Sequence, residues 1–213
     1  MILLIYSKKY GTLGWVSCIT YKRRYFMLFL EKGMADEISI IRAVLDGDVE
    51  SFRDLVRRYE KPVIKMVKNI IDDHHICEDI AQDVFFDVYK KLNSYDPARG
   101  SFLTWVFTIA RNKSLNVLKK KRCLTINGVP GEINSSCPTD SLMQREFFEQ
   151  LDEALRNLPF KQKTAFVLAE FEELPYEQIA QIEGVRIGTI KSRINRAKCK
   201  LRIALKRVEG NKS

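Results

Sequence analysis

Residues 175–196 read PYEQIAQIEGVRIGTIKSRINR, and the spacing of their small, turn-forming and apolar residues predicts a helix-turn-helix. Pro175 stands where the first turn of a helix tolerates proline. Ala180 is small enough for a second helix to cross it closely, and Gly184 can adopt the left-handed conformation of a tight turn. The apolar residues that would hold the two helices together are Ile179, Val185, Ile190 and Ile194.

The second helix of this motif would carry a basic face. Residues 186–207 contain nine lysines and arginines and no acid. A helix that enters the major groove of DNA needs outward side chains of this kind. The outward positions are Arg186, Thr189, Lys191, Ser192, Arg193 and Arg196. A solvated basic face on an ordinary helical hairpin is the alternative, and the turn spacing together with the absence of acids favours DNA binding.

On both sides of this motif, the apolar residues keep a helical period over most of the chain from Met34. Pro62 predicts the start of a new helix, and Ser101 offers an N-cap to a helix that runs to about residue 121. Gly, Pro, Ser and Asn then interrupt the pattern. We expect an all-α chain of two small helical domains joined by a flexible linker. The expected segments are a domain at 34–121, a linker at 122–140, a domain at 141–208 that contains the helix-turn-helix, and a tail at 209–213.

The first 33 residues differ in pattern from the rest of the 213-residue chain. They carry five of its nine net positive charges, and these charges cut the apolar runs far short of the ~20 residues that a membrane-spanning helix needs. We therefore expect no membrane insertion. Because the amphipathic pattern begins at Met34, one hypothesis is that translation starts there and that residues 1–33 are not native. A genuine basic tail is the alternative.

The composition and the reactive side chains exclude several classes of protein. With 46% hydrophobic residues and only ten Gly and six Pro, the chain is neither collagen-like nor of low complexity. Its five cysteines have no close pair spacing, which favours a reducing cytoplasm over a disulfide scaffold. His74, His75 and Cys77 lack a second pair of zinc ligands, and the chain has no phosphate-binding loop or nucleophile elbow. We expect no enzyme activity, no metal and no cofactor.

Two charged segments of opposite sign precede the linker. Residues 111–122 hold six basic residues and no acid, downstream of Phe102, Trp105 and Phe107. Basic side chains neutralise phosphates and an exposed aromatic can stack on an unpaired base; we expect Phe102 and Phe107 in the core and leave Trp105 open. Residues 72–87 hold six acids and no Lys or Arg, which favours a basic protein partner over DNA. A solvated acidic face is the alternative.

Three stretches of the chain resemble the conserved domains of bacterial sigma factors, of the sigma-70 family and its extracytoplasmic-function (ECF) type. They begin at residues 52, 78 and 158 and read FRDLVRRYEKPVIKMV, EDIAQDVFFDVYKKLNSYDPARGSFLTWVFTIARNKSLNVLKKKR and LPFKQKTAFVLAEFEELPYEQIAQIEGVRIGTIKSRINRAKCKLR. The resemblance covers about residues 40–207, and its specificity lies in the combination of EDIAQDVF, GSF, IARN and GTIKSR.

The resemblance implies an alternative sigma factor that binds core RNA polymerase, reads the −35 and −10 promoter elements and helps to open the −10 DNA, under the control of an anti-sigma factor. It implies polymerase docking by Glu78, Asp79, Asp83 and Asp87. It places Tyr95, Asp96, Arg99, Ser101, Phe102 and Trp105 around the melted −10 bases, and Arg111, Asn112, Asn116, Lys119 and Lys120 on the −10 DNA. The implied −35 contacts are the six outward residues of the second helix.

One residue departs from the family pattern, and one other function competes with this interpretation. Glu183 stands where many members have an apolar residue, so we expect either looser packing there or an outward-pointing carboxylate. The leading alternative function is a stand-alone helix-turn-helix regulator. It accounts for residues 175–207 but gives no role to the acidic and basic–aromatic segments. A non-specific nucleic-acid binder has no need of the acidic segment either.

Overall fold

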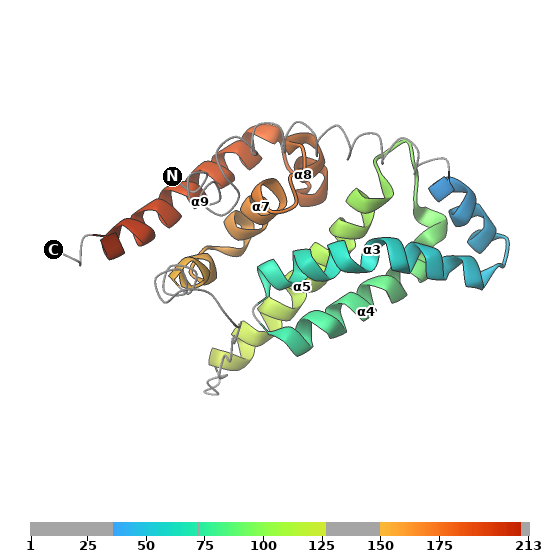
Figure 1. Ribbon diagram of the computed structural model, residues 1–213, viewed down its shortest axis with the longest axis horizontal. Coiled ribbons are helices and arrows are strands. Elements are labelled where there is room, and N and C mark those ends of the chain that lie inside the picture. Colours follow the sequence, from blue (N-terminus) through green and yellow to red (C-terminus); the bar gives the residue numbers. More distant parts are fainter. Residues whose placement is uncertain (1–35, 72, 127–149, 210–213) are drawn as a thin grey trace, which may run out of the picture. The chain divides into compact units, whose positions relative to one another are not determined.

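The computed structural model describes residues 36–71, 73–126 and 150–209, and every regular element within these ranges is helical (Figure 1). The expected all-α fold is therefore confirmed. The chain divides between Leu55 and Val56 into two units, which we describe separately. Most of the expected linker, the start of the expected second domain, the tail from residue 210 and the stretch before residue 36 lie outside the described residues, so their predictions stay predictions.

The first unit contains a helix at residues 36–45 and the start of α3 (Val49–Ile70). Asp48 caps α3, because its carboxylate accepts hydrogen bonds from the Glu50 amide at 3.1 Å and from the Ser51 hydroxyl at 2.6 Å. These bonds, led by that from the Ser51 side chain, lower the pKa of Asp48. The cap explains why α3 begins where it does.

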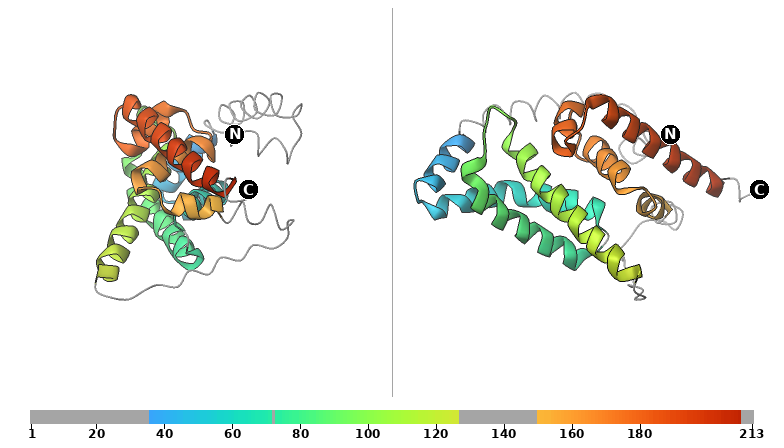
Figure 2. Two further views of the ribbon diagram at one scale, coloured as in Figure 1. Left: turned by 90° about the vertical axis from the view of Figure 1, so that its left-hand side faces the viewer. Right: turned by 180° about the vertical axis from the view of Figure 1, so that it is seen from behind.

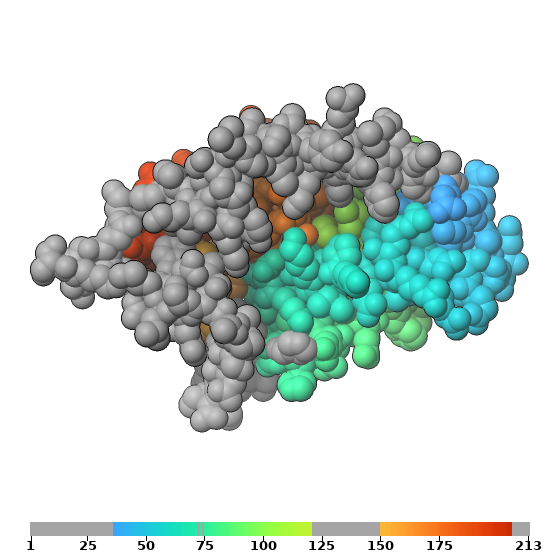
Figure 3. All heavy atoms as spheres, viewed as in Figure 1, coloured from blue at the N-terminus to red at the C-terminus, as the bar shows by residue number. Residues whose placement is uncertain are grey.

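The structure corrects the expected break at Pro62, because α3 continues through this proline. A proline inside a helix removes one backbone hydrogen bond and crowds the preceding turn. Against that cost, Tyr59 lies buried before Pro62, and Val63 and Met66 lie buried after it. One apolar stripe thus runs past the proline, and its packing holds the helix together. The side chains of α3 from Val56 onward lie next to those of α4 in Figure 3.

The second unit continues with α4 (His74–Lys91), the short 3-10 helix η1 (Leu92–Ser94) and α5 (Phe102–Ile126). Asp73 caps α4 by accepting a hydrogen bond from the Ile76 amide at 3.2 Å. The helices α4 and α5 pack against each other. The fully or almost fully buried residues of this first helical domain include Val63, Met66, Val67, Val84, Val88, Leu92, Phe102, Val106 and Phe107.

The beginning of α5 follows the sequence prediction and its end does not. The Ser101 hydroxyl accepts a hydrogen bond from the Thr104 amide at 3.3 Å, which confirms Ser101 as the N-cap. The helix ends at Ile126 instead of near residue 121, so the first residues of the expected linker are helical. The physical reason is that residues 121–126 contain no helix breaker, the first being Gly128.

The C-terminal helices are α7 (Phe160–Glu170), α8 (Tyr176–Glu183) and α9 (Ile187–Glu209), preceded by a helical segment at 150–156. Figure 2 shows the long α9 running past α7, and the two helices pack closely. Their shared core is formed by Ala154, Leu155, Leu158, Phe166, Ala197 and Leu201. No helix among the described residues is long and apolar enough to cross a membrane.

Candidate nucleic-acid interface

The helix-turn-helix predicted at residues 175–196 is present. Pro175 precedes the first residue of α8, and Gly184 follows its last with φ of 64°, the left-handed conformation that glycine adopts without strain. The Gly184 and Val185 amides donate to the Ala180 carbonyl, which closes the turn. Ile179, Ile190 and Ile194 are buried between the helices, and Val185 is half-buried.

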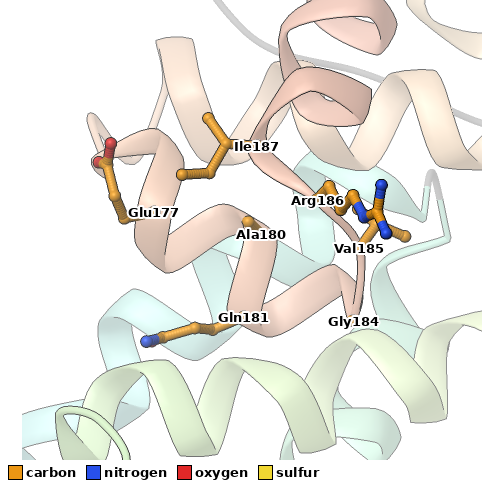
Figure 4. A pocket seen from close by; sticks show the side chains of 7 residues that line it. All are labelled: Glu177, Ala180, Gln181, Gly184, Val185, Arg186 and Ile187. Carbon is orange, nitrogen blue, oxygen red and sulfur yellow. The ribbon is translucent and has the colours of Figure 1, made fainter.

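A shallow hollow lies where α8 meets α9 (Figure 4). Ala180 and Gln181 line it from α8, Gly184 and Arg186 from the turn, and Ile187 from the start of α9. In this view the Ile187 side chain extends over α8 near Ala180, so the small alanine lets the second helix begin close to the first. The hollow therefore belongs to the packing of the motif, not to a binding cavity for a small molecule.

The structure exposes five of the six side chains predicted to read the −35 element. Arg186 is exposed directly before α9, and Thr189, Lys191, Ser192 and Arg196 are exposed on α9. The Ser192 hydroxyl donates to the Gly188 carbonyl at 3.0 Å, so it is partly satisfied by its own helix. Arg193 differs from the other five because its guanidinium turns back toward Glu183. The second helix thus presents an open basic face that begins at the turn.

The aromatic residues predicted near the melted −10 bases form a cluster of three rings, which we call the aromatic cluster: Tyr95, Phe102 and Trp105. Their ring centroids lie 5.2 to 5.6 Å apart. Trp105 and Tyr95 are half-buried, and the Tyr95 hydroxyl donates to the Gly100 carbonyl at 3.2 Å. Asp96 stabilises the turn before α5, because its carboxylate accepts a hydrogen bond from the Ala98 amide.

One predicted −10 contact requires correction. Phe102 has an exposed fraction of 0% and also packs against Tyr59 at 5.2 Å, so it cannot touch a base in this conformation. Its role is to support Trp105 and Tyr95 from beneath. The expectation that Phe102 and Phe107 belong to the core is confirmed, since Phe107 is 1% exposed. Trp105, whose position the sequence left open, is half-buried, so it belongs partly to the core and partly to the surface.

The polar residues predicted on the −10 DNA lie at different depths. Those at the surface are Arg99, Asn112, Asn116, Lys119 and Lys120. Ser101 is half-buried, and its hydroxyl bonds with that of Thr104. Arg111 is held in an ion pair that the sequence did not predict.

The acidic residues of α4 fall into two groups. Glu78 and Asp79 are exposed near the start of the helix. Asp83 and Asp87 lie within 3.6 and 3.2 Å of the Lys113 ammonium of α5, and Asp87 also pairs with Lys91 at 3.2 Å. Burial raises the pKa of Asp87, but the hydrogen bonds from the two lysines outweigh it and hold that pKa below its usual value. Part of the acidic segment therefore stabilises its own domain.

Glu183 is the residue whose role sequence reasoning missed. Of the two expected alternatives, looser packing or an outward-pointing carboxylate, the structure contradicts the second, because the Glu183 side chain has an exposed fraction of 0%. Its carboxylate accepts from Arg111 Nε at 3.0 Å and Nη2 at 3.3 Å, and from Arg193 Nη1 at 2.6 Å. The only signal in the sequence was an acid beside the turn glycine, where an apolar residue was expected.

No group of three histidines, cysteines or acids that could hold a metal ion occurs among the described residues. What the described residues present is a helix-turn-helix with an open basic face, an aromatic cluster beside a basic helix, and an acidic helix. This combination indicates a DNA-binding protein that also has a surface suited to a protein partner.

Comparisons with known proteins identify the family. Sigma-70 region 2 matches residues 55–123, and Sigma-70, region 4 matches residues 148–201. The chain is 31% identical over 169 residues to the ECF RNA polymerase sigma factor RpoE of Cereibacter sphaeroides, a match covering 78% of this chain and 93% of the relative. It is 29% identical over 178 residues to the ECF RNA polymerase sigma factor SigW of Bacillus subtilis, covering 78% and 95%.

A solved structure agrees with these matches. The chain is similar to the sigma factor RpoE from Bartonella quintana, solved in complex with the anti-sigma factor NepR, with a TM-score of 0.62, 28% identity, and coverage of 74% of this chain and 98% of that one. This chain belongs to the ECF sigma factors of the sigma-70 family. It is a transcription initiation factor that works with RNA polymerase at specific promoters. A stand-alone regulator is not favoured, because region 2 accounts for the segments that such a regulator leaves without a role.

Proposed function

We propose that this sigma factor reads the −35 element with the exposed face of α9. The observation that carries this proposal is that Arg186 is exposed directly before the second helix of the motif and that Thr189, Lys191 and Arg196 are exposed on its N-terminal half. That part of a recognition helix reaches the base edges in the major groove. Lysine and arginine donate to guanine, and the threonine methyl can contact thymine.

The aromatic cluster is the proposed capture site for an unpaired −10 base. Trp105 is half-exposed and rests on the buried Phe102 ring, so a base that stacks on it meets a rigid support. Stacking contributes about 1–3 kcal/mol per base, which is comparable to the few kcal/mol needed to extrude a base. Arg99, Asn112, Asn116, Lys119 and Lys120 lie at the surface and would hold the backbone and base edges of the opened strand.

The acidic start of α4 is the proposed docking site for core polymerase. Glu78 and Asp79 are exposed, whereas Asp87 is engaged by two lysines of its own domain. Phe86 and Tyr89 are exposed apolar residues on the same helix and would add contact area. We assign the larger share of docking to Glu78 and Asp79, with Asp83 and Asp87 as secondary contacts.

The remaining proposals concern the regulation of the protein and its location in the cell. A relative of this chain was solved with an anti-sigma factor, which supports the proposal that an anti-sigma factor also controls this protein. We further propose that the protein acts in the cytoplasm, where promoters and polymerase are, and that it catalyses no reaction itself. Two domains, the first from residue 34 to the end of α5 at Ile126 and the second at 141–208, are part of the same proposal.

The test is reconstituted transcription. The full chain is mixed with bacterial core RNA polymerase and fragmented genomic DNA, and the 5′ ends of the transcripts are mapped. We expect discrete start sites that share two upstream sequence boxes. Initiation at random positions, in spite of duplex binding by the protein alone, would instead favour the stand-alone regulator.

A further inference from the structure

The Glu183 carboxylate joins two arginines that come from different helical domains. Arg111 lies on α5 and grips both carboxylate oxygens, while Arg193 lies on α9 and bonds to Oε2. The side chains of Arg111 and Arg193 are only 13% and 14% exposed. Arg111 also donates to the Asn112 side chain at 2.9 Å and faces the Phe160 ring at 5.6 Å. Neither guanidinium is free to meet a phosphate or a base.

A second contact joins the same two domains away from Glu183. The Lys65 ammonium on α3 donates to the Phe171 carbonyl at 2.8 Å and pairs with the Glu172 carboxylate at 3.3 Å. Burial raises the pKa of Glu172, and Lys65 opposes that rise. The helices α5 and α8 also pack directly, and the Gln181 side chain approaches Gly100 so closely that a Cβ there would lie 3.2 Å from its oxygen.

This arrangement is incompatible with simultaneous promoter contacts. The −35 and −10 elements are about 25 base pairs apart, which is about 85 Å of B-DNA at 3.4 Å per base pair. One carboxylate holds Arg111 and Arg193 within 3.3 Å of its own atoms. The family resemblance implies a −10 contact for Arg111 and a −35 contact for Arg193, and the two cannot both reach DNA until Glu183 releases at least one of them.

We propose that Glu183 is an internal latch that keeps the free sigma factor closed, by occupying one promoter-contacting arginine from each DNA-binding domain. The latch opens when Glu183 releases either arginine and the two helical domains move apart. This inference rests on the proposed function and on the promoter contacts that the family resemblance implies for Arg111 and Arg193. A buried carboxylate between two guanidinium groups suits such a switch, because the cluster is satisfied in the closed state and each arginine finds an alternative anion on DNA.

The test compares Glu183→Gln with Glu177→Gln in the full chain without polymerase. Both variants remove one negative charge from α8, but Glu177 is exposed and takes no part in the arginine cluster. Binding is measured to a single-stranded −10 oligonucleotide and to a −35 duplex, both taken from promoters mapped with the holoenzyme. We expect Glu183→Gln to bind each probe about fivefold or more tightly than Glu177→Gln does, the low end of typical coupling between sites. We also expect a larger radius of gyration by small-angle X-ray scattering.

A second variant keeps the proposal testable if Glu183→Gln fails to fold. Glu172→Gln removes the Lys65 ion pair and touches neither arginine, so tighter binding to the −10 strand would again indicate opening. Equal affinities and equal radii for Glu183→Gln and Glu177→Gln would overturn the latch. If the wild-type chain gave no discrete start sites with polymerase, the proposed function would fail instead, and transcription separates the two results.

Discussion

The starts of α5 and α9 are the two proposed DNA-reading regions, and they differ in how much of their chemistry lies at the surface. On α9 the basic and polar side chains are already exposed. At α5 the rings of Tyr95 and Trp105 are half-buried against Phe102. A duplex presents its base edges to the outside, so its reader needs only exposed donors. An unpaired base must be stacked, so its site is an apolar cluster whose rings contact one another until the base arrives.

The largest expected effect comes from Trp105→Ala, which removes the stacking surface. We expect strand opening by the holoenzyme to fall by about 1–3 kcal/mol, roughly 5- to 150-fold, while formation of the closed complex changes little. Permanganate reactivity of the −10 thymines measures opening, and a gel shift at low temperature measures the closed complex. Trp105→Phe is the control, because it keeps an aromatic ring. Equal losses in both assays would show that Trp105 only stabilises the fold.

The matching substitution on α9 is Lys191→Ala. Its ammonium is exposed on the proposed reading face, so we expect duplex affinity to fall by about 1–3 kcal/mol and discrimination at one −35 position to relax. Lys200→Ala is the control, since nine residues at 100° each place Lys200 on the opposite side of the helix. Competition binding with duplexes mutated at single −35 positions gives both quantities. A loss that is the same for every sequence would reduce Lys191 to a phosphate contact.

The sequence could predict the features that depend on local chemistry, and it could not predict those that depend on tertiary contacts. The turn at Gly184 and the cap at Ser101 follow from local chemistry, and the structure has both. The predicted helix start at Pro62 was wrong, because buried residues on both sides of the proline hold α3 together by tertiary packing. The local preference of proline for the first turn of a helix does not take such packing into account. Glu183 was misread for a related reason. Its partner Arg111 lies 72 residues away, and no periodicity links the two positions.

A smaller effect is expected on the free energy of unfolding when the turn before α9 is changed. Gly184 has φ of 64° and open space around the position of a Cβ, so Gly184→Ala adds backbone strain without a collision. We expect the free energy of unfolding to fall by about 1–2 kcal/mol. Gly188→Ala is the matched control, because Gly188 lies inside α9 with equally open space, and alanine there should stabilise by about 0.5–1 kcal/mol. Urea unfolding of both variants checks the opposite signs. Equal shifts would contradict the left-handed turn.

The smallest effect concerns the ion pairs between the acidic side chains of α4 and Lys113 of α5. The pKa of Asp87 is lowered by Lys113 and Lys91, so its ion pairs contribute stability that is complete above the ordinary value of 3.8 and is lost as the pH falls through the lower, folded value. Lys113→Met should move that pKa back toward 3.8 and remove about 0.5 kcal/mol at neutral pH, as for a partly exposed pair. Carboxyl-carbon NMR titration of Asp87 measures the shift. Lys119→Met is the control, since Lys119 is exposed further along α5. An unchanged Asp87 titration in Lys113→Met would show that Lys113 does not lower the pKa of Asp87, and it would contradict the assignment of Asp87 as a residue held by its own domain.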